Sequence, residues 1–330
     1  MKKILMILLI VLMVVSTSLF AEGQAEVAET ADSYPSKPMT VIVEYNAGGS
    51  TDMLGRAIAS IIPKYLDQPM VVVNKPGGSG MIGVDAVLKA KPDGYTLGTT
   101  SSGPFTTVPM TQKAPYDPVN DVQFIATFTL GPIIICSSAD APWDDLNDLV
   151  KDAKANPGKY IYGQNAPGGT THIAMEIFRS AAGIDMKMMP YNSGSEVAAA
   201  LLGGHVDTGT LSPAEAAEHV KAGTLKMLGV FNPGRMADYP DVKTALEQGY
   251  DVQVAVPKGI FAPAGIDSAI AEKLEAALEQ VYNDEEFKAI VKQIGLAPEL
   301  FWMNMADSQK FMKGLYDSMK PVVEQLGLGN

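Results

Sequence analysis

Two loops of this chain repeat one pattern, and the repeat constrains the possible folds more than any other feature. Residues 46–52 read Asn-Ala-Gly-Gly-Ser-Thr-Asp, and residues 165–172 read Asn-Ala-Pro-Gly-Gly-Thr-Thr-His. Each loop follows a short strand-like run and opens an amphipathic helix pattern. Because more than a hundred residues separate the loops, they predict two domains, each of which presents one loop to a shared cleft.

The residue types in both loops are those that bind an anion. Glycine lets the backbone approach a ligand closely, Ser, Thr and Asp cap a helix start, and the free N–H groups of the first turn favour negative charge. Neither loop has the lysine of a phosphate-binding P-loop or the spacing of a dinucleotide fingerprint. The candidate ligand-binding residues are Asn46, Ala47, Gly48, Gly49, Ser50, Thr51 and Asp52 in the first loop and Gly168, Gly169, Thr170, Thr171 and His172 in the second.

Two features of these loops stay open on the sequence alone. Either loop by itself could be an ordinary strand-to-helix turn, and the duplication with hydroxyls at matching offsets is what favours ligand contact. Asp52 can cap its helix, or it can face the cleft and accept a hydrogen bond from an ammonium, a hydroxyl or water. A third glycine-rich turn at residues 77–80 has no matching partner, and we interpret it as structural.

Hydroxyl residues at two other predicted strand ends are further candidates. Ser101 and Ser102 follow a strand predicted over residues 95–100, and Ser212 follows one predicted over residues 206–211. Ligands of α/β proteins bind at the carboxyl ends of parallel strands. We therefore include Ser101, Ser102 and Ser212 among the candidate ligand contacts.

Strand and helix patterns alternate along most of the chain. The strands predicted at residues 40–45, 70–73 and 95–100 alternate with helices, which indicates a parallel-rich α/β sheet. After a further strand candidate at residues 122–128, the pattern restarts with a strand at residues 133–137. The sequence thus predicts two successive α/β units.

The end of the chain has a different character. From residue 260 onward the pattern consists of long helices, predicted at residues 268–282, 285–294 and 308–325, without a strand. We expect this tail to pack back on the first unit. The chain would then cross between the domains twice, near residues 131–136 and near residues 255–261.

The first 21 residues have the layout of a secretory signal peptide. Lys2 and Lys3 precede an apolar run over residues 4–15, and small residues precede Ala21. We predict export with cleavage near Ala21. An uncleaved anchor is the alternative, although the run is shorter than a bilayer span needs. Residues 22–33 are polar and without periodicity, which predicts a disordered spacer.

The charge balance excludes several partner classes. The chain has a formal net charge of −12, and removal of Lys2 and Lys3 leaves 23 basic against 37 acidic residues, or −14. A nucleic-acid or anionic-membrane partner is not expected, since no basic stripe or aromatic platform is present. The overall field would also oppose an anionic ligand, so local backbone dipoles must bind it. The lone Cys136 cannot form an internal disulfide, and we predict a buried thiol.

Catalytic and metal-binding patterns are missing from the sequence. Its three histidines, His172, His205 and His219, have no metal-ligand spacing, and no Gly-x-Ser-x-Gly elbow is present. We predict no catalytic residues, no metal and no cofactor. An enzyme that acts on small acids through Asp52 or His172 is the less favoured alternative.

A set of short motifs, taken in order and with their spacing, resembles the periplasmic solute-binding proteins of tripartite tricarboxylate transporters, also called Bug proteins. No single motif is decisive, but together they extend over nearly the whole chain after residue 33. The motifs lie at residues 34–38 (Tyr-Pro-Ser-Lys-Pro), 48–52, 74–77 (Asn-Lys-Pro-Gly), 92–97 (Pro-Asp-Gly-Tyr-Thr-Leu), 115–118 (Pro-Tyr-Asp-Pro), 168–172, 190–191, 201–207, 219–223 and 261–265.

The resemblance implies an α/β, two-lobed type II periplasmic-binding fold with the ligand cleft between the lobes. Lobe 1 would comprise residues 34–132 and 258–330, and lobe 2 residues 133–257. The protein would be a periplasmic monomer that closes on a small carboxylate and delivers it to membrane permease subunits. The ligand class would be a di- or tricarboxylate, an acidic amino acid or an aromatic acid. A ligand-sensing module for a membrane receptor is the alternative role.

The resemblance also implies roles for the two loops. Gly48 to Asp52 and Gly168 to Thr171 would hold carboxylate oxygens through N–H and hydroxyl groups, partly through water, and Asp52 would orient the rest of the ligand. The sequence departs from the family pattern at residues 44–47, Glu-Tyr-Asn-Ala in place of Pro-Phe-x-Pro, and at Pro257-Lys258. None of its three arginines lies in either glycine loop, so we expect recognition by neutral donors and helix dipoles.

Overall fold

The computed structural model describes residues 31–329. Residues 35–329 belong to one compact unit, and residues 31–34 are described only as a short turn before it. The predicted signal peptide and most of the predicted spacer, residues 22–30, lie outside the described residues. Among the residues that are described, no helix is both long and apolar enough to cross a membrane.

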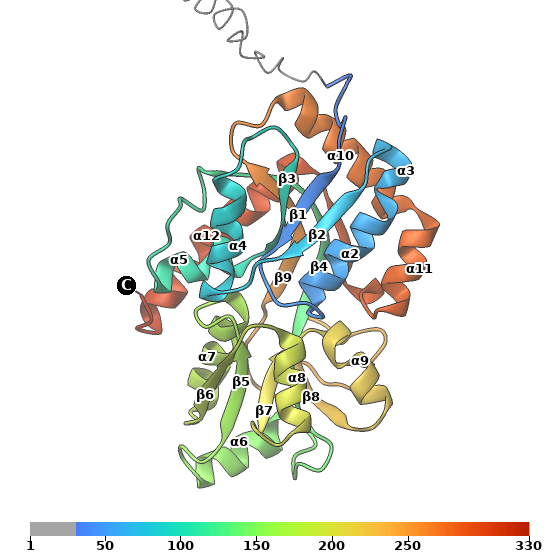
Figure 1. Ribbon diagram of the computed structural model, residues 1–330. Helices are drawn as coiled ribbons and strands as arrows, with labels where there is room; N and C mark the ends of the chain where they lie inside the picture. Colours follow the sequence, from blue (N-terminus) through green and yellow to red (C-terminus); the bar gives the residue numbers. More distant parts are fainter. Residues whose placement is uncertain (1–30, 330) are drawn as a thin grey trace, which may run out of the picture. The chain divides into compact units, whose positions relative to one another are not determined.

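Two groups of elements are connected through the long strand β4 (Val122–Ser138), as Figure 1 shows. The first half of β4 pairs with β9 (Ala255–Pro263), and the second half pairs with β7 (Thr208–Leu211) and β8 (Leu225–Phe231), all antiparallel. One continuous strand therefore runs where two strands were predicted. The sequence Leu130-Gly131-Pro132 reads as a break, yet Gly131 and Pro132 pair in register with Val256 and Ala255 of β9.

The first group contains a mixed sheet, with both parallel and antiparallel pairs of strands. Strand β1 (Met39–Val43) pairs in parallel with β2 (Met70–Asn74) and with β3 (Thr96–Ser101), and β3 pairs antiparallel with β9. Within this group, the predicted parallel arrangement thus holds for β1, β2 and β3, whereas β9 pairs antiparallel. The helices of this group are α2 (Ser50–Ile61), α3 (Pro63–Leu66), α4 (Met81–Leu88), α5 (Thr107–Thr111), α10 (Ser268–Asn283), α11 (Glu285–Gln293) and α12 (Met305–Gln325).

The tail packs on this first group, as expected, but it also contains a strand that was not predicted. Strand β10 (Leu300–Met303) pairs antiparallel with β4, opposite Thr129 and Thr127. The expectation of a purely helical tail was wrong because β10 has only four residues and an irregular register, and such a short run carries no period-2 signal.

The second group repeats the β-loop-α arrangement. Strand β5 (Ile161–Asn165) pairs in parallel with β6 (Lys187–Tyr191) and β7. Helices α6 (Leu146–Ala155), α7 (Thr170–Ala182), α8 (Gly194–Leu202) and α9 (Pro213–Lys221) belong to this group. Helix α9 was not predicted, although its Ser-Pro-Ala-Glu start has the sequence of a capping box with Pro at the first helical position.

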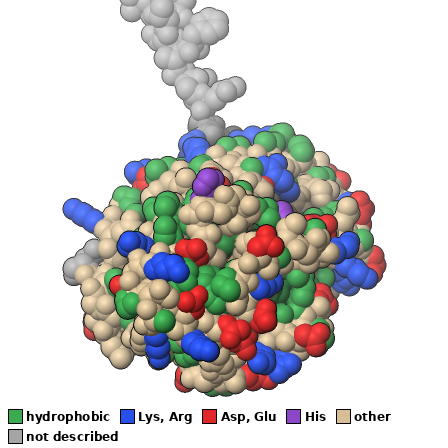
Figure 2. All heavy atoms as spheres, turned by 90° about the horizontal axis from the view of Figure 1, so that it is seen from below, with side chains coloured by type: hydrophobic (Ala, Val, Ile, Leu, Met, Phe, Trp, Pro, Cys, Tyr) green, Lys and Arg blue, Asp and Glu red, His purple; other side chains and the backbone are tan. Residues whose placement is uncertain are grey.

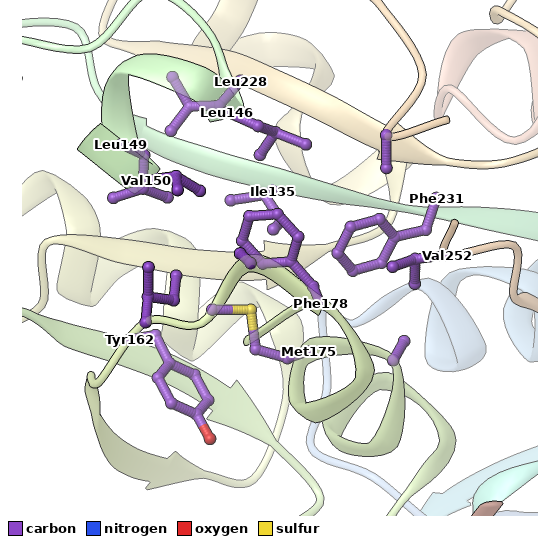
Figure 3. Packing of buried hydrophobic residues seen from close by; sticks show 14 of the residues in the cluster. Ile135, Leu146, Leu149, Val150, Tyr162, Met175, Phe178, Leu228, Phe231 and Val252 are labelled. Carbon is purple, nitrogen blue, oxygen red and sulfur yellow. The ribbon is translucent and has the colours of Figure 1, made fainter. Parts of the chain in front are cut away.

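A large apolar core stabilises the second group, and Figure 3 shows its centre. Ile135 of β4 lies between side chains of α6 and α7, and Phe178 of α7 packs against Phe231 of β8 with ring centroids 5.7 Å apart. Leu146 and Leu149 of α6 are fully buried in the same cluster. Cys136, the next residue of β4, is also buried, in agreement with the prediction of a buried thiol.

Candidate functional site

The two repeated loops have the same backbone conformation. Gly48 and Gly168 have φ of +85° and +80°, in the region that glycine adopts without strain. The next residues, Gly49 and Gly169, are the N-caps of α2 and α7, with φ/ψ of −76°/162° and −74°/172°. The sequence repeat therefore produces two matched helix N-termini, as predicted.

A second feature shared by the two loops is a hydrogen bond that fixes each loop in place. The N–H of Gly48 donates to Oδ2 of Asp52 at 2.9 Å, and the N–H of Gly168 donates to Nδ1 of His172 at 3.0 Å. In each loop the acceptor is the side chain four residues after the glycine. Asp52 and His172 thus hold the backbone in the conformation that places the next N–H groups at the helix start.

Both helix N-termini line one cavity of about 50 Å³. Of the residues predicted from the sequence, the cavity is lined by Gly49, Ser50, Thr51, Ser101, Gly169, Thr170, Thr171 and Ser212. The structure therefore brings together residues from both loops and from two strand ends. Their contact with a ligand remains a prediction.

The other predicted residues do not line the cavity. They are Asn46, Ala47, Gly48, Asp52, Ser102, Gly168 and His172. Ser102 is fully buried, and its Oγ lies 2.8 Å from Oγ1 of Thr170, which does line the cavity. Asn46 donates through Nδ2 to Glu196 of α8. Ser102 and Asn46 therefore support the site from outside the lining, whereas Ala47 and Gly48 are exposed.

Asp52 has its oxygens occupied by groups of the protein. Its carboxylate accepts hydrogen bonds from Arg56 Nε at 3.0 Å and from Asn74 Nδ2 at 2.9 Å, besides that from Gly48. Burial alone would raise the pKa of Asp52, but the hydrogen bonds from Arg56, Gly48 and Asn74 outweigh it and hold this pKa below 3.8. The structure thus favours the helix-cap reading of Asp52 over a direct contact with the ligand.

His172 is held as a neutral acceptor. Since Nδ1 accepts the N–H of Gly168, the ring proton belongs on Nε2, which lies 3.6 Å from Glu176 Oε1. Burial lowers the pKa of His172 below 6.5, Glu176 acts in the opposite direction, and Arg179 lowers it further. Protonation of Nδ1 would remove the acceptor that fixes the second loop.

Several cavity residues were missed by sequence reasoning. The most polar of them are Tyr45, Asn165, Ser193, Glu215 and Lys258. Asn165 belongs to the repeated pattern itself, and Glu215 could have been found as the last residue of the Ser-x-x-Glu capping box. Lys258 belongs to the Pro257-Lys258 departure from the family pattern, but no local pattern placed it in the cavity lining, because its position depends on how β9 crosses between the two groups.

Lys258 supplies a cation where only neutral donors were expected. Its Nζ lies 2.8 Å from Oε2 of Glu299, and both side chains are buried. Burial raises the pKa of Glu299, although the attraction to Lys258 lowers it. Lys258 therefore belongs to the cavity wall as one half of a buried ion pair.

Glu215 puts a carboxylate of the chain at the first helix N-terminus. Its Oε1 accepts the N–H of Ser50, the first residue of α2, at 2.9 Å. Its Oε2 accepts the N–H of Ser212 at 2.9 Å within the capping box of α9. The α2 terminus therefore already binds a carboxylate in this structure, as the dipole of a helix favours.

Further contacts close the cavity by linking the two groups of elements. Ser79 Oγ and Gln112 Nε2 both donate to the carbonyl of Pro167, at 2.7 Å each. Gly103 lies so close to the second loop that a Cβ there would be 3.2 Å from Cα of Gly169. Ser79 belongs to the turn at residues 77–80 that we interpreted as structural, and it contributes one of these closing contacts.

The residues that the structure describes contain no group of three or more His, Cys, Asp or Glu side chains placed to bind a metal ion. The surface shown in Figure 2 has Lys and Arg side chains interspersed with Asp and Glu, without a continuous basic patch. The cavity instead combines helix N-termini, hydroxyl groups, one carboxylate and one ammonium group. Such a set of groups suits reversible binding of a small polar solute.

An α/β fold of two lobes with a polar cavity between matched helix N-termini defines a periplasmic-type solute-binding protein. The chain belongs to the tripartite tricarboxylate transporter receptor family, TctC, whose model matches residues 54–328. It is 34% identical over 301 residues to a UPF0065 protein from the gbd 5′ region of Cupriavidus necator, with 90% of each chain covered. It is 32% identical over 266 residues to protein BugT of Bordetella pertussis, with 80% of this chain and 81% of BugT covered.

Solved structures agree with this assignment. The periplasmic binding protein BugD is 28% identical, with a TM-score of 0.83 over 90% of this chain and 99% of BugD. R. palustris Rpa4515, solved with adipate, shares the fold with a TM-score of 0.85 at 24% identity, over 90% of this chain and 99% of that one. The resemblance to Bug proteins and the two-lobed fold predicted from the sequence are thus confirmed. The family is one of solute-binding proteins, not of enzymes.

Proposed function

We propose that the protein captures a small organic carboxylate in the cavity between the N-termini of α2 and α7. The ligand class is a di- or tricarboxylate, an acidic amino acid or an aromatic acid. The observation that carries the proposal is the pair of matched glycine loops, which line one cavity from two sides. A helix N-terminus favours a carboxylate through its N–H groups and its dipole, and here two of them converge.

Binding would rest on many modest contributions. Each helix terminus contributes roughly 0.3 to 1 kcal/mol, and each hydrogen bond to a charged group about 1.5 to 3 kcal/mol. Three or four such contacts are enough for micromolar affinity, which corresponds to about 8 kcal/mol. Candidate donors are the first-turn N–H groups of Thr51, Thr170 and Thr171 and the ammonium group of Lys258.

Capture would occur by closure of two lobes, residues 34–132 with 258–330 and residues 133–257. The proposal is supported by the two crossings of the chain, in β4 and in β9, and by the small number of hydrogen bonds between the lobes. Strands β4 and β9 would act as the hinge. Opening would break the hydrogen bonds of Ser102 with Thr170, of Ser79 and Gln112 with Pro167, of Asn46 with Glu196 and of Ser50 with Glu215. These bonds are few enough to be reversible.

The wider role would be delivery of the bound acid to a permease of the tripartite tricarboxylate type. Family membership and the signal-peptide pattern of residues 1–21 support export to the periplasm and this partner. The cheapest discriminator from a sensing role is whether genes for membrane permease subunits lie beside the gene. Uptake measured with those subunits, with and without this protein, would test delivery directly.

Thermal unfolding of the mature protein tests the capture of an acid. Ligands to compare are mono-, di- and tricarboxylates, amino acids and neutral sugars. A ligand at about 100 times its Kd stabilises the native state by roughly 2.7 kcal/mol, which raises the melting temperature by several degrees. We expect this shift with at least one acid. Stabilisation by neutral sugars and by no acid would contradict the proposal.

A further inference from the structure

The two matched helix N-termini differ in what faces them, and Glu215 makes the difference. From this asymmetry we propose that the cavity selects a ligand with one carboxylate beside an ammonium group, as in a zwitterionic amino acid, and that Glu215 is the residue that determines this specificity. The inference rests on the proposed capture of a carboxylate in the same cavity. It goes further by assigning a different ligand group to each terminus.

The asymmetry concerns the first residue of each helix. At α2, the N–H of Ser50 donates to the carboxylate of Glu215 at 2.9 Å. At α7, the corresponding residue is Thr170, whose Oγ1 lies 2.8 Å from the hydroxyl of Ser102. The α2 terminus is thus occupied by an anion of the chain, whereas the α7 terminus faces neutral hydroxyls. The ligand's carboxylate therefore belongs at α7.

Glu215 is held from its own side of the cavity. Its second oxygen, Oε2, accepts the N–H of Ser212, and Ser212 Oγ in turn accepts the N–H of Glu215 at 3.4 Å. This capping box lies within α9, so the orientation of Glu215 does not depend on closure. A ligand that enters the cavity would therefore meet the Glu215 carboxylate already in place.

The backbone next to Glu215 is shaped to admit its carboxylate. A Cβ at Gly194 would lie 2.1 Å from Oε2 and 2.5 Å from Oε1 of Glu215, far inside van der Waals contact. Gly194 begins α8 and lines the same cavity. The absence of a side chain at Gly194 leaves the space that the Glu215 carboxylate occupies.

The charges in the cavity wall favour a zwitterion over a dianion. The charged side chains of the lining are Glu215 and Lys258, and Lys258 is already paired with buried Glu299. Glu215 is thus the charged side chain of the lining without an oppositely charged partner, and its oxygens accept only the backbone N–H groups of Ser50 and Ser212. A second carboxylate on the ligand would lie against Glu215, whereas an ammonium group would donate charge-assisted hydrogen bonds to it.

Matched pairs of ligands test the proposal by isothermal titration calorimetry. Each pair shares a skeleton and differs by the amino group: glutamate with glutarate, aspartate with succinate, and alanine with propionate. The protein is unfolded and refolded first, to remove any ligand retained on purification. In the pair that binds best, we expect the amino member to bind at least about tenfold more tightly, the factor that one charge-assisted hydrogen bond supplies.

The variant Glu215→Gln tests the residue itself. Gln still accepts the Ser212 N–H in a capping box, so α9 should fold, but the attraction for an ammonium group is lost. We expect the preference of this variant for the amino member of the pair to fall to about threefold or less. The control is Glu247→Gln, because Glu247 also caps a backbone N–H, that of Thr244 at 2.8 Å, and does not line the cavity. A second variant, Gly194→Ala, displaces the Glu215 carboxylate sterically and should weaken the preference in the same way.

The outcomes distinguish the proposed role of Glu215 from the proposed capture of an acid. If the amino member of the best pair binds no more tightly than its partner, or if both Glu215→Gln and Gly194→Ala keep the full preference, the role of Glu215 is overturned while acid capture stands. If no acid of any pair binds, the proposed function fails instead. A tenfold preference that falls in both variants and persists in Glu247→Gln supports the assignment.

Discussion

At the scale of single residues, Asp52 and His172 have the same structural role, although one is a carboxylate and the other an imidazole. Each accepts the N–H of a glycine four residues earlier, so each fixes one loop. The offset is visible in the sequence repeat, but its meaning is not, because a side chain at a helix start can equally face the ligand. The capping box makes Glu215 visible in the sequence, but its contact with Ser50 is not visible there, nor is the pairing of Lys258 with Glu299, because these partners are distant in the chain.

His172 should make the protein sensitive to mild acid. Its pKa in the folded protein is lowered below 6.5, first by burial, so the unfolded chain binds the proton more readily. The contribution of neutral His172 is therefore fully present above about pH 6.5 and is lost as pH falls toward the folded-state pKa. We expect thermal stability and acid binding both to decrease over this range in the wild type.

The variant His172→Asn should remove part of this pH dependence, because an amide oxygen can accept the Gly168 N–H without titrating. The expected difference is on the order of 1 kcal/mol, the value of one hydrogen bond. His219→Asn on α9, away from the cavity lining, is the control. Melting curves at a series of pH values measure both. An unchanged pH profile in His172→Asn would contradict the role of Nδ1.

Gly49 is the position where a side chain should affect binding most selectively. A Cβ there would meet Glu215, Asn46 and Ser193 at 3.5 to 3.6 Å, which is ordinary contact, and its φ of −76° suits any residue. Gly49→Val should therefore leave the melting temperature of the free protein within a few degrees, yet block the α2 terminus. We expect acid affinity to fall at least about a hundredfold, through loss of about 3 kcal/mol.

Valine substitutions at two other glycines serve as comparisons for Gly49→Val. At Gly169 a Cβ would lie 2.8 Å from the carbonyl oxygen of Ala166, so Gly169→Val should weaken both the fold and binding. At Gly314 on α12 nothing lies within 4 Å, so Gly314→Val should change neither. Calorimetric titration and thermal melting of the three variants give the comparison. Wild-type affinity in Gly49→Val would mean that the first loop is only a turn.

At the scale of elements, apolar periodicity and capping residues predicted helices and strands well. Pairing between distant parts of the chain could not be predicted from them. Helix α6 and strand β8 have the predicted bounds, since α6 has a clear apolar face and an Asp145 cap and β8 is a buried run. Strand β4 was predicted in two pieces because Gly131 and Pro132 usually interrupt a strand. Here β9 pairs with β4 across that point, and no local pattern reports a partner more than a hundred residues away.

The ion pair of Lys258 and Glu299 links β9 to the short turn Ala297–Glu299 before β10, and its loss should destabilise the fold. Lys258→Met leaves a buried carboxylate without its cation, which costs about 3 to 5 kcal/mol at neutral pH. The double variant with Glu299→Gln removes both charges and should recover most of this loss. Urea unfolding of the wild type, the single variant and the double variant measures the free energies.

This destabilisation should also depend on pH in a defined direction. Burial raises the pKa of Glu299 above 4.5, and without Lys258 it rises further. The folded state then binds the proton more tightly than the unfolded chain, so the defect of Lys258→Met is smallest near pH 4.5 and grows as pH rises toward the folded-state pKa. An equal defect at pH 4.5 and pH 7 would show that lost packing, not charge, is its cause.

At the scale of the whole molecule, the order of motifs indicated two lobes, but not how they meet. The hydrogen bonds between the lobes come from Asn46, Ser50, Ser79, Ser102 and Gln112 on one side and Pro167, Thr170, Glu196 and Glu215 on the other. Four of these residues, Ser79, Gln112, Glu196 and Glu215, lie outside the motifs that the sequence singles out for ligand contact. Their positions follow from the path of β4 and β9, since a strand shared by both groups fixes the direction in which one group faces the other.

If closure is what retains the ligand, a covalent link across the cavity should trap it. The hydroxyl oxygens of Ser102 and Thr170 are 2.8 Å apart, so the double variant Ser102→Cys/Thr170→Cys can form a disulfide after small adjustments. The natural Cys136 is buried and should not compete. With labelled ligand bound before oxidation, we expect release to slow by at least about tenfold, since opening is blocked, and to recover after reduction.

The single variant Ser102→Cys, carried through the same oxidation, is the matched control and should release ligand at the same rate in both redox states. Mass spectrometry establishes that the disulfide of the double variant has formed. Release at the wild-type rate from a fully cross-linked protein would mean that the ligand leaves without separation of the lobes. In that case β4 and β9 would be a rigid connection instead of a hinge, and affinity would depend on the cavity wall alone.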